Sequence, residues 1–105
     1  MDYSEIRHCL AECRFTDHAR REMETELLGR IGVEEVLHAL DTGEIIEEYP
    51  DDKPYSSALI LGWTAAGRPL HIVCAPVVPE KRLIIITTYE PDPHRWAPDF
   101  RRRKS

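Results

Sequence analysis

The sequence lacks the features that would place it in several common classes of protein. Its 105 residues contain no apolar run approaching the ~18 residues needed to cross a bilayer. The first ten residues, MDYSEIRHCL, have no basic stretch followed by an apolar core, which is the pattern of a secretion signal. We therefore expect a cytoplasmic protein that makes no contact with a membrane.

Cysteine is scarce, and its number is odd. Three cysteines cannot form a framework of paired disulfides. Cys9 and Cys13 share a helical stripe with Ile6 and Leu10, which is typical of small apolar core residues. No second closely spaced cysteine pair exists to complete a structural zinc site. We expect neither a metal nor a cofactor.

The signatures of several well-known enzyme sites are also absent. The chain has no phosphate-binding P-loop, GxGxxG, HExxH or GxSxG motif. Its length fits a single domain, because independent folds cluster at roughly 100–150 residues. This excludes an enzyme with a cleft between two lobes.

The net charge of −5 argues against nucleic acid as a partner, but the charge is unevenly distributed. Residues 1–52 carry 5 basic and 15 acidic side chains, whereas residues 53–105 carry 9 basic and 4 acidic ones. Such asymmetry can mark a surface that binds a polyanion. It predicts a basic sheet face and tail, with an acidic helical side turned away.

The pattern of apolar residues predicts an α+β domain spanning residues 1–105. Helical spacing occurs within residues 1–43, at about 4–13, 17–28 and 33–41. Strand-like segments follow within residues 44–89, at 44–49, 57–65, 68–78 and 82–89. We expect the helices to pack on one face of a four-stranded, mainly antiparallel meander sheet. Residues 90–105 are expected to form an irregular basic tail.

His18 and His71 stand out among the polar residues. His18 lies at the start of the second expected helix, where the helix dipole favours a neutral imidazole able to act as a base. An exposed histidine with no role is the alternative. His71 interrupts an apolar strand. If Ala66-Gly67 is a two-residue hairpin loop, His71 lies opposite Gly62, and the glycine leaves a gap on that face.

The next strand brings either Thr88 or Tyr89 beside His71, depending on the register. The result is either a small polar site on the sheet or a histidine that is hydrogen-bonded by Thr88 and has no further function.

The tail combines aromatic and basic residues. Tyr89, Trp96 and Phe100 lie close in sequence to Arg95 and to the RRRK run at 101–104. This combination suits single-stranded RNA, whose unstacked bases lie on aromatic rings and guanidinium planes. The alternative is a solvated tail with Trp96 attached to the core.

Taken together, four segments resemble an uncharacterised bacterial family of the domain-of-unknown-function kind, over about residues 14–103. They are FTDHARREM, GVEEVLHALDTGEIIEEYPDDKPY, LGWTAAGRPLHIVCA and IIITTYEPDPHRW. That family is similar to the RelE-like and BrnT-like toxins, which are small α+β endoribonucleases. Its members are often encoded beside a zinc-finger antitoxin of the YgiT/MqsA type. The resemblance implies a RelE/BrnT-like toxin that cleaves mRNA and is held inactive by an antitoxin protein.

The resemblance also places candidate site residues. Cleavage by such toxins needs no metal: a base activates the ribose 2′-hydroxyl, an acid protonates the leaving 5′-oxygen, and a cation stabilises the phosphate. The candidate catalytic residues are His18, His71 and Tyr89. The candidate RNA- and phosphate-binding residues are Arg21, Arg68, Thr87, Arg95 and Trp96.

Two aspects of this hypothesis stay open. A mechanism in which the two histidines act as a pair requires His18 and His71 to lie on the same side of the sheet. Family members commonly carry an arginine where this chain has Glu22, which shifts the phosphate-binding role to the adjacent Arg21. This departure and the overall acidity favour the alternative, a catalytically inactive protein-binding module with the toxin fold. A homodimer is left open.

Overall fold

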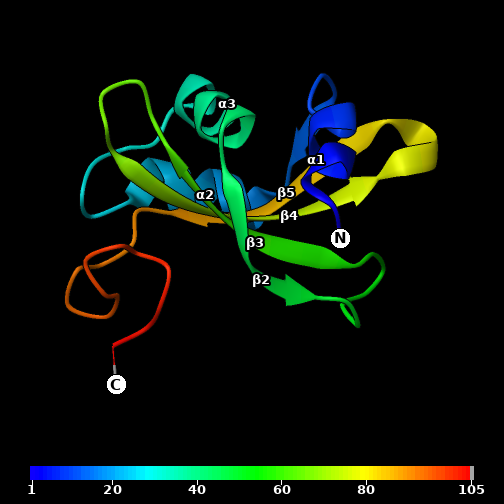
Figure 1. The fold of residues 1–105 in the computed structure, drawn as a ribbon. Coiled ribbons are helices and arrows are strands. Elements are labelled where there is room, and N and C mark those ends of the chain that lie inside the picture. The colour runs from blue at the N-terminus through cyan, green and yellow to red at the C-terminus, as the bar shows by residue number, and fades with distance from the viewer. Residues whose placement is uncertain (105) are drawn as a thin grey trace.

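The computed structural model describes residues 1–104 and has the α+β architecture that the sequence predicts (Figure 1). The helices are α1 (Tyr3–Cys9), α2 (Asp17–Thr25) and α3 (Val33–Asp41), with a short 3-10 helix, η1 (Val78–Glu80). The strands are β1 (Cys13–Phe15), β2 (Glu44–Tyr49), β3 (Ser57–Trp63), β4 (Pro69–Val77) and β5 (Arg82–Tyr89). No helix within residues 1–104 is long and apolar enough to span a membrane.

The sheet has five strands in the order β1-β5-β4-β3-β2. Strands β2 to β5 form the predicted antiparallel meander, whereas β1 pairs with β5 in parallel. The sheet therefore has one strand more than the four that the sequence predicts. A three-residue strand is too brief to show a period of two, and its partner lies about 70 residues further along the chain.

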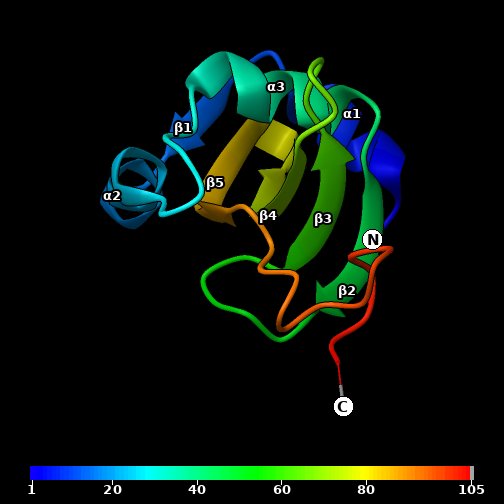
Figure 2. The ribbon, with the colours of Figure 1, turned by 90° about the vertical axis from the view of Figure 1, so that its left-hand side faces the viewer.

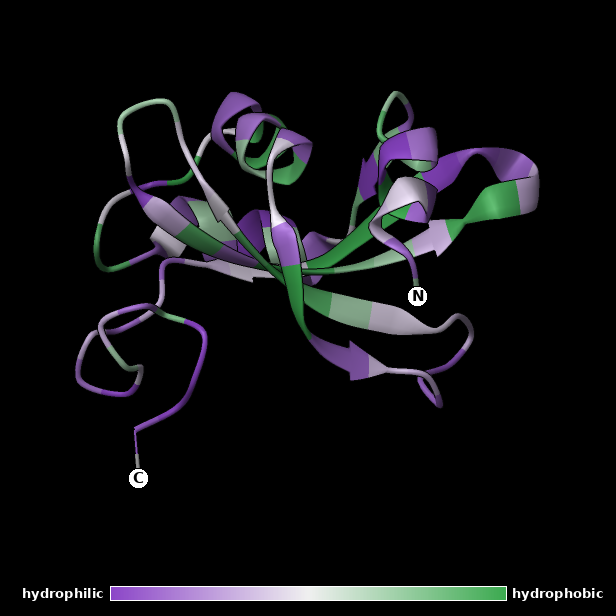
Figure 3. Cartoon of the chain, in the orientation of Figure 1, coloured by the Kyte–Doolittle hydropathy of each residue, from purple (hydrophilic) through white to green (hydrophobic). Residues whose placement is uncertain are grey.

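Helices α1 and α3 pack on one face of the sheet, as expected, whereas α2 lies along the edge of β5 with Ala19 and Met23 in the same core (Figures 1 and 2). The buried side chains of the three helices form one cluster with alternate residues of the strands. The helical members are Ile6, Cys9, Ala19, Met23, Val36, Ala39 and Leu40, and the strand members include Ile60, Leu70, Ile72, Cys74, Leu83 and Ile85. Hydrophilic residues gather on the outer helix surfaces and the tail (Figure 3). Because side chains alternate along a strand, His71 points to the opposite face, which we call the open face.

The hairpin between β3 and β4 differs from the expected two-residue loop. Thr64 and Arg68 close a three-residue loop, because the Thr64 amide donates to the Arg68 carbonyl at 2.9 Å. Gly67 adopts a φ of 83°, which favours glycine. The register therefore shifts by one residue, so His71 pairs with Leu61 and not with Gly62.

Gly62 faces the helices and not a gap beside His71. A Cβ atom at Gly62 would lie 2.2 Å from the carbonyl oxygen of Ala39 in α3. The glycine therefore permits the close approach of α3 to the sheet.

Glu22 of α2 and Glu26, the residue that follows this helix, complete the edge of β5. Strand β1 pairs with β5 only at residues 83–85, so the following amides of β5 have no partner strand. The Thr88 amide donates to the Glu22 carboxylate at 3.1 Å, and the Glu90 amide donates to Glu26 at 2.9 Å. Glu22 therefore has a structural role at the position where the family resemblance led us to expect an arginine.

Replacing Glu22 tests this role. We expect Glu22→Ala to lower the free energy of unfolding by about 1–2 kcal/mol, because the buried Thr88 amide loses its acceptor. The matched control is Glu24→Ala, which removes an exposed ion pair with Arg30 and should change stability by less than about 0.5 kcal/mol. Urea denaturation of both variants measures the difference. Equal effects would contradict the role.

Candidate functional site

The tail leaves β5, crosses the end of the open face and reaches β2 (Figure 2). It folds back on itself, because the Ala97 amide donates to the Arg102 carbonyl and the Lys104 amide donates to the Arg95 carbonyl, both at 2.8 Å. Trp96 is buried beneath this turn, and the Arg103 guanidinium lies 4.7 Å from the centre of its ring. These contacts hold the tail against the sheet.

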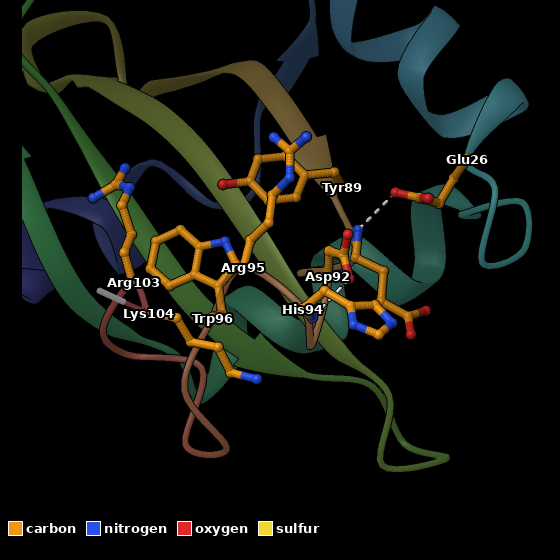
Figure 4. Close-up of a pocket in the computed structure, with 9 residues that line it drawn as sticks. Glu26, Tyr89, Asp92, His94, Arg95, Trp96, Arg103 and Lys104 are labelled. Carbon is orange, nitrogen blue, oxygen red and sulfur yellow. Dashed lines mark hydrogen bonds between the residues drawn. The ribbon is translucent and has the colours of Figure 1, made fainter.

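A pocket of about 710 Å³ lies where the tail leaves β5 (Figure 4). Its lining comes from the end of α2, the end of β5 and both arms of the tail: Glu26, Tyr89, Glu90, Asp92, His94, Arg95, Trp96, Arg103 and Lys104. Tyr89, Arg95 and Trp96 were predicted as site residues, and the structure brings these three together.

The expected separation of charges is wrong. Arg101 forms an ion pair with Glu44 of β2 at 2.5 Å, and Arg103 forms one with Glu47. Burial raises the pKa of Glu47, but hydrogen bonds from Arg103 and Tyr49 outweigh burial and hold the pKa below its ordinary value. The basic tail is thus docked on the acidic edge strand. The pocket also mixes three basic and three acidic side chains.

His71 is completely buried behind the pocket, near the start of β4. Its Nε2 atom lies 2.8 Å from the carbonyl oxygen of Phe100 in the tail, and its Nδ1 atom lies 3.2 Å from the Tyr89 hydroxyl. The rings of His71 and Trp96 meet edge to face, with their centres 4.3 Å apart. The observed register places Tyr89 beside His71, whereas Thr88 pairs with Ile72 and points to the helical face.

The environment of His71 determines its charge. Burial lowers the pKa of His71, since charging the ring would cost more away from water. The ring is therefore neutral at pH 7. Burial likewise raises the pKa of Tyr89, so its hydroxyl keeps its proton.

The structure places His18 and His71, predicted as an acid–base pair, in different environments. His18 lies on α2, which borders the edge of β5 and contributes Ala19 and Met23 to the core (Figure 2). Its side chain is 64% exposed, with Nε2 3.3 Å from the Glu22 carboxylate. His71 is completely buried on the open face, so its ring is not exposed beside His18.

Arg68 is not available as a phosphate-binding residue. Its guanidinium contacts the carboxylates of Glu35 and Glu90 and the carbonyl oxygens of Gly29 and Arg30. These contacts join the α2–α3 loop to the start of β4, which is a structural role.

The remaining two candidates lie outside the pocket. Arg21 is exposed on α2. Thr87 pairs with Val73 on the open face but is not among the residues that line the pocket.

Six lining residues of the pocket were not among the predicted site residues: Glu26, Glu90, Asp92, His94, Arg103 and Lys104. His94 precedes Arg95-Trp96 directly, and the RRRK run contains the two cations, so these residues left a signal in the sequence. Glu26 left none, because its place depends on how α2 meets the end of β5. Within residues 1–104, no group of three or more His, Cys, Asp or Glu side chains is arranged to hold a metal ion.

The burial of His71 predicts a pH-dependent stability. The unfolded chain binds a proton near the ordinary pKa of 6.5, whereas the folded chain binds it only at lower pH. The free energy of unfolding should therefore fall as the pH drops below about 6.5, until the lower pKa of the folded state is reached. Denaturation curves between pH 5 and 8 measure this slope. His71→Gln should flatten it, and replacement of the exposed His38 by Gln should not; an unchanged slope in His71→Gln would contradict the assignment.

Comparison with known proteins identifies the family. No curated protein and no solved structure matches the chain. The family described as a domain of unknown function, DUF4258, matches residues 15–90. The match begins at Phe15, the last residue of β1, and ends at Glu90, directly after β5, so α1 and most of the tail lie outside it. Since the matched region is well over half of the sequence, the chain belongs to the DUF4258 family of domains of unknown function.

Proposed function

We propose that this protein is the toxin of a bacterial toxin–antitoxin pair and cleaves mRNA without a metal, using the pocket at the end of β5. The observation that carries the proposal is the gathering of Arg95, Lys104, Tyr89 and Trp96 around one pocket. These are the side chains that bind phosphates and nucleobases in complexes with single-stranded RNA. The pocket volume also falls in the range of small-ligand sites, which suits one nucleotide.

The pocket supplies the groups that such cleavage needs. Arg95 and Lys104 provide positive charge for the phosphate, whose negative charge grows in the transition state. Tyr89 can accept the proton of the 2′-hydroxyl while its own hydroxyl proton passes to Nδ1 of His71, 3.2 Å away, and His94 can donate a proton to the leaving 5′-oxygen. In this scheme His71 stands behind Tyr89 and does not touch the substrate.

The acidic residues of the pocket are largely engaged. Glu26 accepts the Glu90 amide, Glu90 pairs with Arg68, and Asp92 accepts the His94 amide at 2.8 Å. Arg103 is held by Glu47, so we assign the phosphate to the Arg95 and Lys104 side chains. The antitoxin, of the zinc-finger type implied by the resemblance, would inhibit by covering this pocket.

One observation favours the alternative function, a protein-binding module without activity. Arg101 and Arg103 are neutralised by Glu44 and Glu47, so the basic run contributes less to a polyanion site than its sequence predicts. On this reading the pocket receives a segment of a partner protein.

Expression of the protein tests the proposal. We expect the wild-type chain, expressed without a partner, to slow growth and to fragment mRNA. Tyr89→Phe should reduce cleavage about 100-fold, which is the lower end of the range for loss of a proton-transfer group. Both Tyr89→Phe and Arg95→Ala should restore growth. Tyr55→Phe, which removes a tyrosine hydroxyl outside the pocket, is the control and should remain toxic.

Primer extension on purified RNA gives the direct readout. If a folded wild-type protein leaves growth normal and RNA intact, the endoribonuclease hypothesis is contradicted and the protein-binding module is favoured.

A further inference from the structure

The hydrogen bonds of His71 fix the orientation of its protons. The Phe100 carbonyl can only accept, so the Nε2 atom at 2.8 Å must carry a hydrogen. The neutral ring then leaves Nδ1 without a hydrogen, and this atom can only accept. The Tyr89 hydroxyl at 3.2 Å must therefore donate its proton to Nδ1.

This arrangement decides what Tyr89 offers to a ligand. A tyrosine hydroxyl has one proton to donate and lone pairs that accept. Because the proton is directed to His71, the oxygen can only accept a hydrogen bond from a molecule in the pocket. Tyr89 lines the pocket, and its hydroxyl points toward the side where Arg103 lies (Figure 4).

The tail holds this arrangement in place. Phe100 has a φ of 59°, a left-handed conformation that is uncommon for a bulky residue. Its ring meets Trp63 of β3 edge to face, with the centres 6.1 Å apart. The flanking Arg101 and Arg103 are attached to β2. The carbonyl that sets the state of His71 is therefore fixed from both sides.

We propose that His71 and Tyr89 together recognise the ribose 2′-hydroxyl group, so that the pocket prefers ribonucleotides to deoxyribonucleotides. A 2′-hydroxyl donates to the Tyr89 oxygen, whereas deoxyribose has no donor at that position. Arg95 and Lys104 lie in the same pocket and bind the adjacent 3′-phosphate. Tyr89 is the specificity-determining residue, and His71 is a positioning residue that acts through it. The inference rests on the proposed function, because it assumes a nucleotide ligand.

The test measures binding without cleavage. Ribonucleoside 3′-monophosphates keep the 2′-hydroxyl and the 3′-phosphate but have no nucleoside leaving group, so they are not cleaved. The four ribonucleotides and their 2′-deoxy counterparts are titrated into the full chain and followed by NMR, with inorganic phosphate as a third ligand. We expect the ribonucleotides to bind about tenfold more tightly, the effect of one well-formed hydrogen bond.

The variants separate recognition from structure. Tyr89→Phe removes the accepting oxygen and should abolish the preference while leaving phosphate binding unchanged. His71→Gln carries its amide at the distance of Nε2, so it can still donate to Phe100, but it has only carbon at the position of Nδ1. This variant should also lose the preference. Tyr55→Phe is the matched control and should keep it. Thermal melting establishes that each variant is folded.

Equal affinity of the wild type for both sugars, or a preference that survives in Tyr89→Phe, would overturn the inference. The proposed function is judged separately by cleavage of an RNA oligonucleotide. Cleavage without a sugar preference refutes this inference alone, whereas a sugar preference without cleavage supports it and refutes the nuclease. Failure of every nucleotide to bind refutes both.

Discussion

The hydrogen bond between the His71 ring and the Phe100 carbonyl is the constraint on which the open face depends. A histidine buried on a central strand must satisfy both ring nitrogens away from water, or its burial becomes costly. The sheet itself supplies only Tyr89, so the second partner has to come from elsewhere. The tail supplies it. Covering His71 also draws the two arms of the tail together above β5 and creates the pocket.

Charge attraction determines how the tail reaches that position. The arginines of the tail and the glutamates of β2 are separated by about half of the chain, and their ion pairs lie on the surface. Exposed ion pairs contribute little to stability individually, and salt screens them. Their contribution here is one of direction, because they bring Phe100 to His71. Part of the positive charge of the tail is therefore neutralised by glutamates of β2 and does not attract a partner.

The sequence predicts the parts of the fold that depend on local periodicity. The three helices and the four longer strands occur where the pattern predicts them, and α1 and α3 cover one face of the sheet (Figure 2). Both helix ends that were placed too late, at residues 13 and 28, lie beyond the last buried residue of their helix, Cys9 and Met23. Strand β1 was not predictable in this way, because it depends on a partner strand that is distant in the sequence. The register of the β3–β4 hairpin was not predictable either, because it depends on the hydrogen bond from Thr64 that closes the loop.

The site was predicted only in part, for a related reason. Tyr89, Arg95 and Trp96 are close in sequence, so their chemical types already suggested a common surface. The pairing of His18 with His71 depended on which face each residue occupies. Alternation along β4 gives the face of His71, but only the packing of α2 gives that of His18. Arg68 was predicted to bind a phosphate because the sequence does not reveal its four partners within the protein. These partners come from three segments that are distant from Arg68 in the sequence.

The two glutamates that cover the β5 edge have a consequence for how this protein behaves among copies of itself. An exposed strand edge invites the addition of a strand from another molecule, which is a route to aggregation. At this edge the amides of Thr88 and Glu90 are already occupied by the carboxylates of Glu22 and Glu26. An incoming strand would have to displace both hydrogen bonds and approach two negative charges. Helix α2 thus protects the sheet against polymerisation at the same place where it borders the pocket.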